Sequence, residues 1–172
     1  MKEIRWHARA GQGAKTAAQL LAVALLTEGK AAQAFPEYGP ERRGAPMRAY
    51  TRYDDRPIRR HDSVESPDVV VVLEPGLAGQ PDVLAGLEPK GLLLVNSSIP
   101  IPGAVTVAAD REAPQAVNLF VLGALARLLG EPTLEHLIAA AVDVLGHKVG
   151  AETVREPLEA GYAAVTEERW AA

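Results

Sequence analysis

The fold is decided by the stretch Arg5-Trp6-His7-Ala8-Arg9-Ala10-Gly11-Gln12-Gly13 and the apolar sequence that follows it. Residues 1–8 alternate loosely between polar and apolar side chains and predict a first strand. From Ala14 to Glu28, apolar residues recur at the i, i+3, i+4 and i+7 spacing of a helix, and Gly29 is expected to cap it. A strand, a glycine turn and a helix in this order can offer free backbone N–H groups to an anion.

The turn Gly11-Gln12-Gly13 matches neither of two known phosphate-binding patterns. The dinucleotide fingerprint G-x-G-x-x-G requires glycine where Thr16 stands. A Walker A loop requires lysine and threonine directly after the glycine, but Ala14 separates Gly13 from Lys15. Two interpretations therefore stay open: a turn that donates backbone N–H groups to a ligand, and a corner that uses glycine for steric reasons.

The rest of the chain predicts one α/β domain over residues 1–172. Strands are predicted at residues 31–35, 47–53, 69–73, 92–95 and 105–108, and helices at residues 117–129, 134–145 and 151–169. The runs at 69–73 and 92–95 are continuously apolar, which is typical of strands buried on both faces. Strands mixed with helices predict a three-layer fold, with a largely parallel or mixed sheet and helices on both faces.

Composition excludes several classes of protein. No apolar run approaches the roughly 20 residues that a transmembrane helix needs, and no apolar signal core follows Met1, so we expect a soluble cytoplasmic protein. The net charge of −4 argues against a nucleic-acid binder. The chain has no cysteine, so it can form neither disulfides nor thiolate-ligated iron–sulfur clusters. Any electron transfer linked to this protein is expected on another chain.

Arginine is concentrated between residues 41 and 62, where seven arginines face four acidic residues. The seven are Arg42, Arg43, Arg48, Arg52, Arg56, Arg59 and Arg60. The guanidinium group suits carboxylates and phosphates and is enriched in protein interfaces. The preceding stretch Phe35-Pro36-Glu37-Tyr38-Gly39-Pro40 has two aromatic rings on a proline-stiffened loop. This combination favours a partner interface, with a small anionic ligand and a plain solvated surface as alternatives.

The sequence predicts no catalytic residue and no metal site. A G-x-S-x-G nucleophile elbow is absent, and His61-Asp62-Ser63 are adjacent in sequence, which does not produce the geometry of a triad. The histidines show no metal-ligand spacing such as H-E-x-x-H. His136 is expected to be structural, whereas His7, just before the glycine turn, is kept as a candidate site residue.

Two segments resemble the gamma subunit of pyruvate and other 2-oxoacid:ferredoxin oxidoreductases. The stretch from Arg5 to Gly13 resembles the opening H-G-x-G-G-Q-G of that family, and residues 33–46 are similar to its second signature almost letter for letter. The resemblance covers residues 3–162. Ala8 and Ala10 stand where the family usually has glycine, which restricts the backbone there.

The resemblance implies a subunit that is not catalytic alone. The complex would decarboxylate a 2-oxoacid oxidatively with coenzyme A, giving acyl-CoA, carbon dioxide and reduced ferredoxin. Thiamine diphosphate would be held mainly by other subunits and iron–sulfur clusters by cysteine-rich partners, with no cofactor expected in this chain. The implied partners are alpha, beta and ferredoxin-like subunits and, indirectly, ferredoxin. A homo-oligomer is one expected form of the isolated chain.

The expected contacts follow from the two signatures. Gly11, Gln12 and Gly13 would donate backbone N–H groups to an anion or a partner carbonyl. The residues expected at an interface or ligand are Glu41, Arg42 and Arg43, with Glu37 and Tyr38 holding the loop. Two alternatives are a free-standing nucleotide- or phosphate-binding regulatory module and an architectural spacer.

Overall fold

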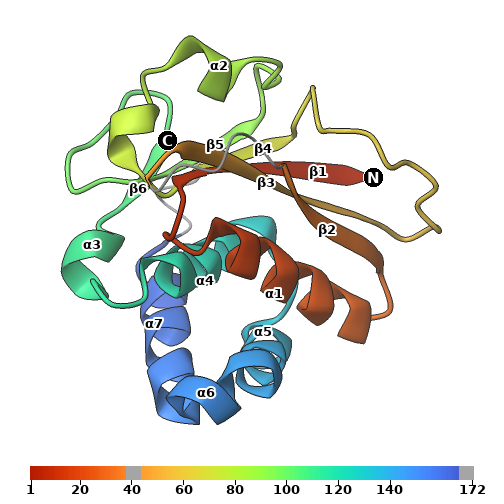
Figure 1. Cartoon of the computed structure of the whole chain (residues 1–172), viewed down its shortest axis with the longest axis vertical. Helices are drawn as coiled ribbons and strands as arrows, with labels where there is room; N and C mark the ends of the chain where they lie inside the picture. The colour runs from red at the N-terminus through yellow and green to blue at the C-terminus, as the bar shows by residue number, and fades with distance from the viewer. Residues whose placement is uncertain (38–43, 167–172) are drawn as a thin grey trace.

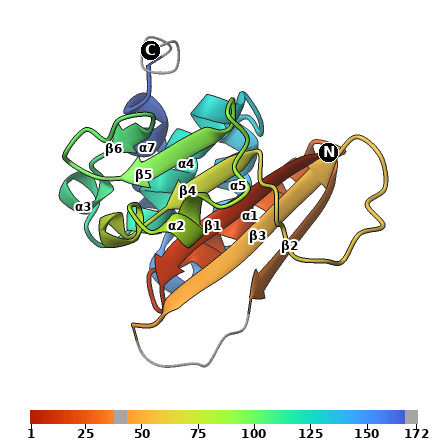
Figure 2. The same ribbon diagram turned by 90° about the horizontal axis from the view of Figure 1, so that it is seen from above.

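The computed structural model describes residues 1–37 and 44–166. Within them, six strands form one mixed sheet in the order β2-β3-β1-β4-β5-β6 (Figures 1 and 2). The strands are β1 (Lys2–Arg9), β2 (Ala31–Glu37), β3 (Pro46–Asp54), β4 (Val69–Val72), β5 (Leu92–Asn96) and β6 (Val105–Val107). β1, β4, β5 and β6 are parallel, whereas β3 is antiparallel to both β1 and β2. The predicted mixed sheet is confirmed.

The helices cover the two faces of the sheet unequally. One face carries the long helices α1 (Ala14–Thr27), α4 (Val117–Leu129), α5 (Leu134–Ala141) and α7 (Ala151–Ala163). Of the described helices and turns, the other carries only the 3-10 turn η1 (Pro75–Leu77) and the short α2 (Pro81–Leu84), above the sheet in Figure 1. The remaining elements are α3 (Ala109–Glu112), the π-helical turn η2 (Val142–Gly146) and α6 (His147–Val149). No helix in the described part of the chain is long and apolar enough to cross a membrane.

The short elements and two helix ends differ from the sequence expectation. η1, α2 and α3 have three or four residues each, too few for a periodic apolar pattern to form. The helix predicted at 134–145 is α-helical only to Ala141 and continues as η2. The last helix was expected to reach Arg169 but ends at Ala163, and residues 167–172 lie outside the described part.

The alternation of side chains in β1 reflects the unequal layers. Ile4, Trp6 and Ala8 are fully buried in the core beneath the long helices, while Arg5 and His7 point to the opposite face. In β4 and β5 both faces are covered, because a second, smaller core lies under η1 and α2. The prediction that these two apolar runs are buried on both faces is therefore confirmed.

Two glycines allow α4 and α7 to cross in close contact. A Cβ atom on Gly123 would collide with the backbone carbonyl of Leu158, and one on Gly161 would collide with that of Phe120. Both obstacles are backbone atoms, which cannot rotate away as a flexible side chain could. Glycine is therefore required at both positions for this crossing.

Replacement of Gly161 by alanine should therefore destabilise the protein. We expect Gly161→Ala to lower the free energy of unfolding by about 3 kcal/mol, the upper end for an overpacked core. Gly79→Ala is the matched control, since a Cβ there meets nothing within 4 Å. It should range from neutral to about 1 kcal/mol stabilising. Urea unfolding of the two variants tests this, and equal stabilities would contradict the close crossing.

Candidate functional site

The glycine turn between β1 and α1 is closed by its own hydrogen bonds. Gly11 and Gly13 have φ values of +95° and +81°, the left-handed region that favours glycine. The Gln12 side-chain Oε1 accepts from the Arg9 N–H at 2.7 Å, and the Gln12 N–H donates to the Arg9 carbonyl at 3.1 Å. Of the three expected backbone donors, the N–H of Gln12 is thus already engaged.

The same turn contacts two other segments at the carboxyl edge of the sheet. Asn118, in the first turn of α4, donates from Nδ2 to the Gly13 carbonyl at 3.3 Å. Gln12 Nε2 donates to Glu74 Oε2, beyond the end of β4, at 2.8 Å. The turn therefore joins the ends of β1 and β4 to the start of α4, with one carboxylate beside it.

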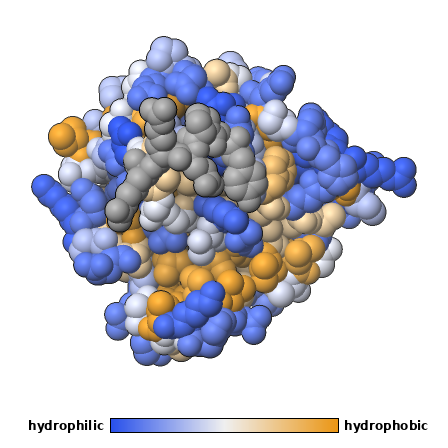
Figure 3. Space-filling model, viewed as in Figure 1, coloured by the Kyte–Doolittle hydropathy of each residue, from blue (hydrophilic) through white to orange (hydrophobic). Residues whose placement is uncertain are grey.

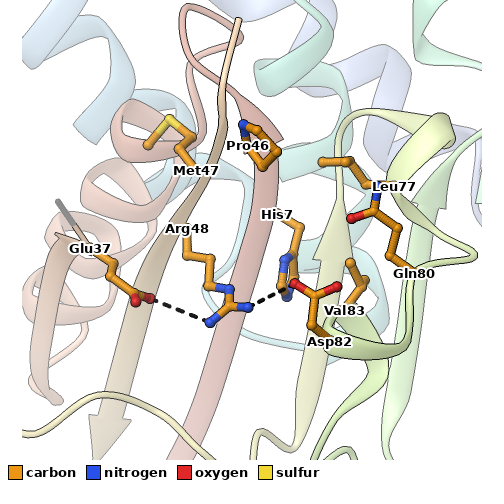
Figure 4. Close-up of a pocket in the computed structure, with 9 residues that line it drawn as sticks. All are labelled: His7, Glu37, Pro46, Met47, Arg48, Leu77, Gln80, Asp82 and Val83. Carbon is orange, nitrogen blue, oxygen red and sulfur yellow. Dashed lines mark hydrogen bonds and ion pairs between the residues drawn. The ribbon is translucent and has the colours of Figure 1, made fainter. Parts of the chain in front are cut away.

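A cavity of about 270 Å³ lies next to the start of β3, on the face that the long helices leave uncovered (Figure 4). Its polar lining comes from β1, β2, β3 and the η1–α2 segment, with His7, Glu37, Arg48, Gln80 and Asp82. Its apolar lining residues are Pro46, Met47, Leu77 and Val83, of which Met47 packs against the larger core on the opposite face of the sheet. The register places His7 opposite Arg48 and Arg48 opposite Glu37, so one row of side chains crosses three strands.

Arg48 is held between two carboxylates. Figure 4 shows its guanidinium group reaching Asp82 on one side and Glu37 on the other. The nitrogen–oxygen distances are 2.9 Å to Asp82 and 3.8 Å to Glu37. Tyr50, next to Arg48 on the same face of β3, donates its hydroxyl hydrogen to Glu37. Burial and this hydrogen bond raise the pKa of Tyr50 to about 12, so the phenol stays protonated.

His7 is held in one protonation state by Arg5. Both side chains are buried, and Arg5 Nε donates to His7 Nε2 at 3.0 Å. Arginine has no acceptor atom, so Nε2 must carry the lone pair and the ring hydrogen must be on Nδ1. Burial, with the positive charges of Arg5 and Arg48, lowers the pKa of His7 to about 4. His7 is therefore a neutral imidazole at physiological pH.

The structure describes four of the predicted site residues, in two places. Gly11, Gln12 and Gly13 form the turn, and Glu37 lies at the cavity. Tyr38, Glu41, Arg42 and Arg43 lie outside the described residues. Within the arginine segment, Arg48 enters the cavity, whereas Arg52 is fully buried and bonded to Glu3 at 2.7 Å, a structural role.

Sequence reasoning missed Gln80, Asp82 and Glu74. Gln80 and Asp82 belong to the η1–α2 segment, which has neither a motif nor a period, and Glu74 simply follows a buried strand. For Glu74, its position directly after the apolar run 69–73 was the one available signal. Among the described residues, no group of three or more histidine, aspartate or glutamate side chains is placed to hold a metal ion.

The six-stranded mixed sheet with helices on both faces defines a single α/β domain. The family model for pyruvate ferredoxin/flavodoxin oxidoreductase matches residues 3–164. The common gamma subunit of the pyruvate and ketoisovalerate oxidoreductases of Pyrococcus furiosus is 40% identical over 93% of this chain and 95% of that protein. The pyruvate synthase subunit PorC of Methanothermobacter thermautotrophicus is 42% identical over 87% of this chain and 88% of that protein. The chain belongs to the pyruvate ferredoxin/flavodoxin oxidoreductase family.

Solved structures agree with this assignment. The crystal structure of the pyruvate oxidoreductase subunit PorC from Thermotoga maritima matches with a TM-score of 0.83 at 38% identity, over 96% of this chain and 97% of that chain. The 2-oxoglutarate:ferredoxin oxidoreductase of Magnetococcus marinus matches with a TM-score of 0.77 at 19% identity. This chain spans 32% of that much longer one, and the likeness shows the fold alone.

The two glycines of the turn should differ in their tolerance of alanine. Gly11→Ala should cost about 1–2 kcal/mol, because only the backbone angle is unfavourable and no atom lies within 4 Å of the new Cβ. Gly13→Ala should lower the free energy of unfolding by at least about 1 kcal/mol more than Gly11→Ala does, because its Cβ would lie 2.5 Å from Asn118 Nδ2. Urea unfolding of both variants measures the difference, and equal losses would argue against the contact with α4.

The neutral state of His7 makes stability depend on pH. The pKa of His7 is about 4 in the fold against an ordinary 6.5, so the unfolded chain takes up the proton first as pH falls. The stabilisation is complete above about pH 6.5 and is lost on the way down to about pH 4. Between pH 7 and pH 5 the wild type should lose about 2 kcal/mol more than His7→Gln, whose side chain does not titrate. Equal losses in urea unfolding would show that His7 is not held neutral.

Proposed function

We propose that this chain is the gamma-type subunit of a 2-oxoacid:ferredoxin oxidoreductase complex and is inactive alone. One observation carries the proposal: the chain is 40% identical to the Pyrococcus furiosus gamma subunit from end to end, with 93% of one and 95% of the other aligned. In the proposed reaction the complex converts a 2-oxoacid and coenzyme A to acyl-CoA and carbon dioxide and reduces ferredoxin. As part of this complex the chain would act in the cytoplasm.

The cofactors are proposed to lie on, or be shared with, other subunits. The chain has no cysteine, so its side chains cannot provide the thiolates that hold iron–sulfur clusters. We assign these clusters to a ferredoxin-like subunit, and thiamine diphosphate to alpha and beta subunits. Coenzyme A would then be bound between this chain and its partners. Ferredoxin itself would be reached only through the cluster-bearing subunit.

The second signature is the proposed contact with ligand or partner. Glu37 and Pro46 belong to this signature, and both line the cavity. Glu41, Arg42 and Arg43, which lie outside the described residues, are proposed to contact a partner subunit or its ligand. Glu37, which accepts from Tyr50, would hold the loop together with Tyr38.

The glycine turn is proposed to meet a partner carbonyl rather than an anion. The N–H of Gln12 is engaged with Arg9, and the carboxylate of Glu74 lies 2.8 Å from the Gln12 side chain. A negative charge at this position repels a phosphate or carboxylate. An uncharged carbonyl can accept from Gly11 or Gly13 without that penalty.

An exposed apolar groove supports a role in assembly. A cavity of about 320 Å³ lies between α1, β2 and η2, where Leu26 and Val144 are 52% and 37% exposed. Its other apolar lining residues are Leu20, Ala22, Val23, Ala32 and Ala34. Figure 3, which has the same viewpoint as Figure 1, shows apolar side chains gathered in the lower part of the molecule, over the helix layer. Such a surface favours association, and in the isolated chain it would favour a homo-oligomer.

Removal of two charges from the second signature tests the proposed function. Arg42→Ala combined with Arg43→Ala should weaken assembly with the partner subunits, or 2-oxoacid-dependent reduction of ferredoxin, by about tenfold or more. The chain itself should remain folded, as judged by thermal unfolding. Arg111→Ala combined with Arg155→Ala removes two exposed arginines elsewhere and is the matched control. Unchanged assembly and turnover in the first variant would contradict the proposed contact.

A further inference from the structure

Strand β2 forms one edge of the sheet, and its outer backbone groups are unpaired (Figure 2). The N–H of Ala10 donates to the opposite carbonyl of Ala45 at 3.0 Å, which fixes the phase of the ladder between β1 and β3. Backbone groups of a strand point alternately to its two neighbours, so the even-numbered residues of β3 bond β2. The register between β2 and β3 then leaves Ala32 and Ala34 pointing outward, with no hydrogen-bond partner in the described part of the chain.

The two ends of this free edge are blocked for pairing. Pro36 follows Ala34 in the same outward phase, and its nitrogen has no hydrogen to donate. At the other end, the N–H of Lys30 is already used by the carbonyl of Leu25 at 3.1 Å. Both a free donor and a free acceptor are therefore offered by Ala32 and by Ala34, the two alanines between these ends.

An uncharged groove continues from this edge. The cavity of about 320 Å³ described above is lined by both alanines, by α1 and by η2, and none of its nine lining residues carries a charge. The pairing of two strands alone covers too little surface for a stable interface, which typically buries roughly 1,200–2,000 Å². A partner that pairs with β2 must therefore cover the groove as well, and the strand edge and the groove form one surface.

We infer that β2 pairs antiparallel with β2 of a second copy of this chain, across a two-fold axis at Gln33. In this register Ala32 lies opposite Ala34 of the second copy, and each of the two symmetric pairs exchanges two hydrogen bonds. Every outward group of the two alanines is then satisfied. A shift by two residues in either direction would place Pro36 or Lys30 opposite an alanine and leave a carbonyl unpaired.

The chemistry of this surface favours a second copy as the occupant. A two-fold axis brings each side chain near it close to its own counterpart, so a charged residue there would meet a like charge. The groove has no charged lining residue, and Gln33 on the axis has an amide that can both donate and accept. The axis is perpendicular to the joined sheet, so the two α1 helices lie on the same side of it. The inference gives a geometry to the homo-oligomer of the isolated chain and does not depend on the partner subunits.

A single cysteine on the axis tests the register, because the chain has no cysteine of its own. Gln33→Cys would form a non-hydrogen-bonded pair with its counterpart, with Cα atoms about 4.5 Å apart, within reach of a disulfide. Mild oxidation of the purified full chain should link it into a disulfide dimer. Ala31→Cys is the matched control, half-buried on the same face of the same strand. Its counterpart would lie about 13 Å away, so the disulfide dimer should form at least about tenfold less.

Variants of the edge and of the groove test the interface itself. The wild-type chain should form a dimer of twice its 18.3 kDa mass, with a dissociation constant on the order of 10 μM by sedimentation equilibrium. Ala34→Pro removes an outward donor and keeps the ladder with β3, and Leu26→Glu places a charge at the groove. Each should weaken the dimer by about tenfold or more while thermal unfolding shows a folded chain. Leu84→Glu, at a residue 41% exposed on the opposite face of the sheet, is the control and should dimerise like the wild type.

Three results would overturn the inference. The wild-type chain remains a monomer at about 1 mM; Ala31→Cys forms the disulfide dimer as readily as Gln33→Cys; or Ala34→Pro and Leu26→Glu both dimerise as strongly as the wild type. The first result would leave a strand from a different polypeptide as the occupant of the β2 edge. All of these measurements use this chain alone, so failure here is distinguishable from failure of the proposed function.

Discussion

The buried guanidinium group of Arg5 is the contact on which the open face of this protein depends. Arg5 is only 3% exposed, and a buried charge is tolerated only when its hydrogen-bonding groups are satisfied. Its donors reach the carbonyls of Val64 and Glu65 in one loop and of Val83 and Ala85 at the end of α2. One side chain of the central strand thus ties down two segments that are about 60 and 80 positions away in the chain.

The cavity follows from this anchoring. Because Arg5 holds the end of α2 against β1, Asp82 comes within 2.9 Å of Arg48 and closes one side of the space above His7. The same guanidinium group fixes the tautomer of His7. The shape of this place and the protonation state of His7 therefore share one cause, the buried guanidinium group of Arg5.

The unequal covering of the sheet assigns different tasks to its two faces. The face beneath the long helices holds the larger apolar core, including Trp6 and Phe120, and supplies most of the stability. The opposite face, over β1, β2 and β3, carries a polar row rather than a core, with His7, Arg48 and Glu37 side by side. A cavity on this polar face costs little stability, because the stability of the fold does not depend on filling that space with apolar side chains.

The local elements were predictable from sequence because each is encoded by neighbouring residues. The first strand, the glycine turn and α1 follow from alternation, from left-handed glycines and from helical spacing within residues 1–29. The second signature likewise includes Glu37 and Pro46, which line the cavity. In contrast, η1 and α2 are too short to have a period, so Gln80 and Asp82 gave no signal as site residues.

The sequence by itself determined that this polypeptide cannot ligate an iron–sulfur cluster through cysteine, that it belongs with α/β proteins, and that its arginines gather in one segment. Only the tertiary structure decided what each arginine does. Arg52 is buried beside Glu3 as part of the framework, while Arg48, four residues earlier on the same face of β3, lines the cavity. The physical reason is that charge compensation depends on which carboxylate lies within about 4 Å, and here the shortest ion pair of each arginine is with a residue 34 or 49 positions away in the chain.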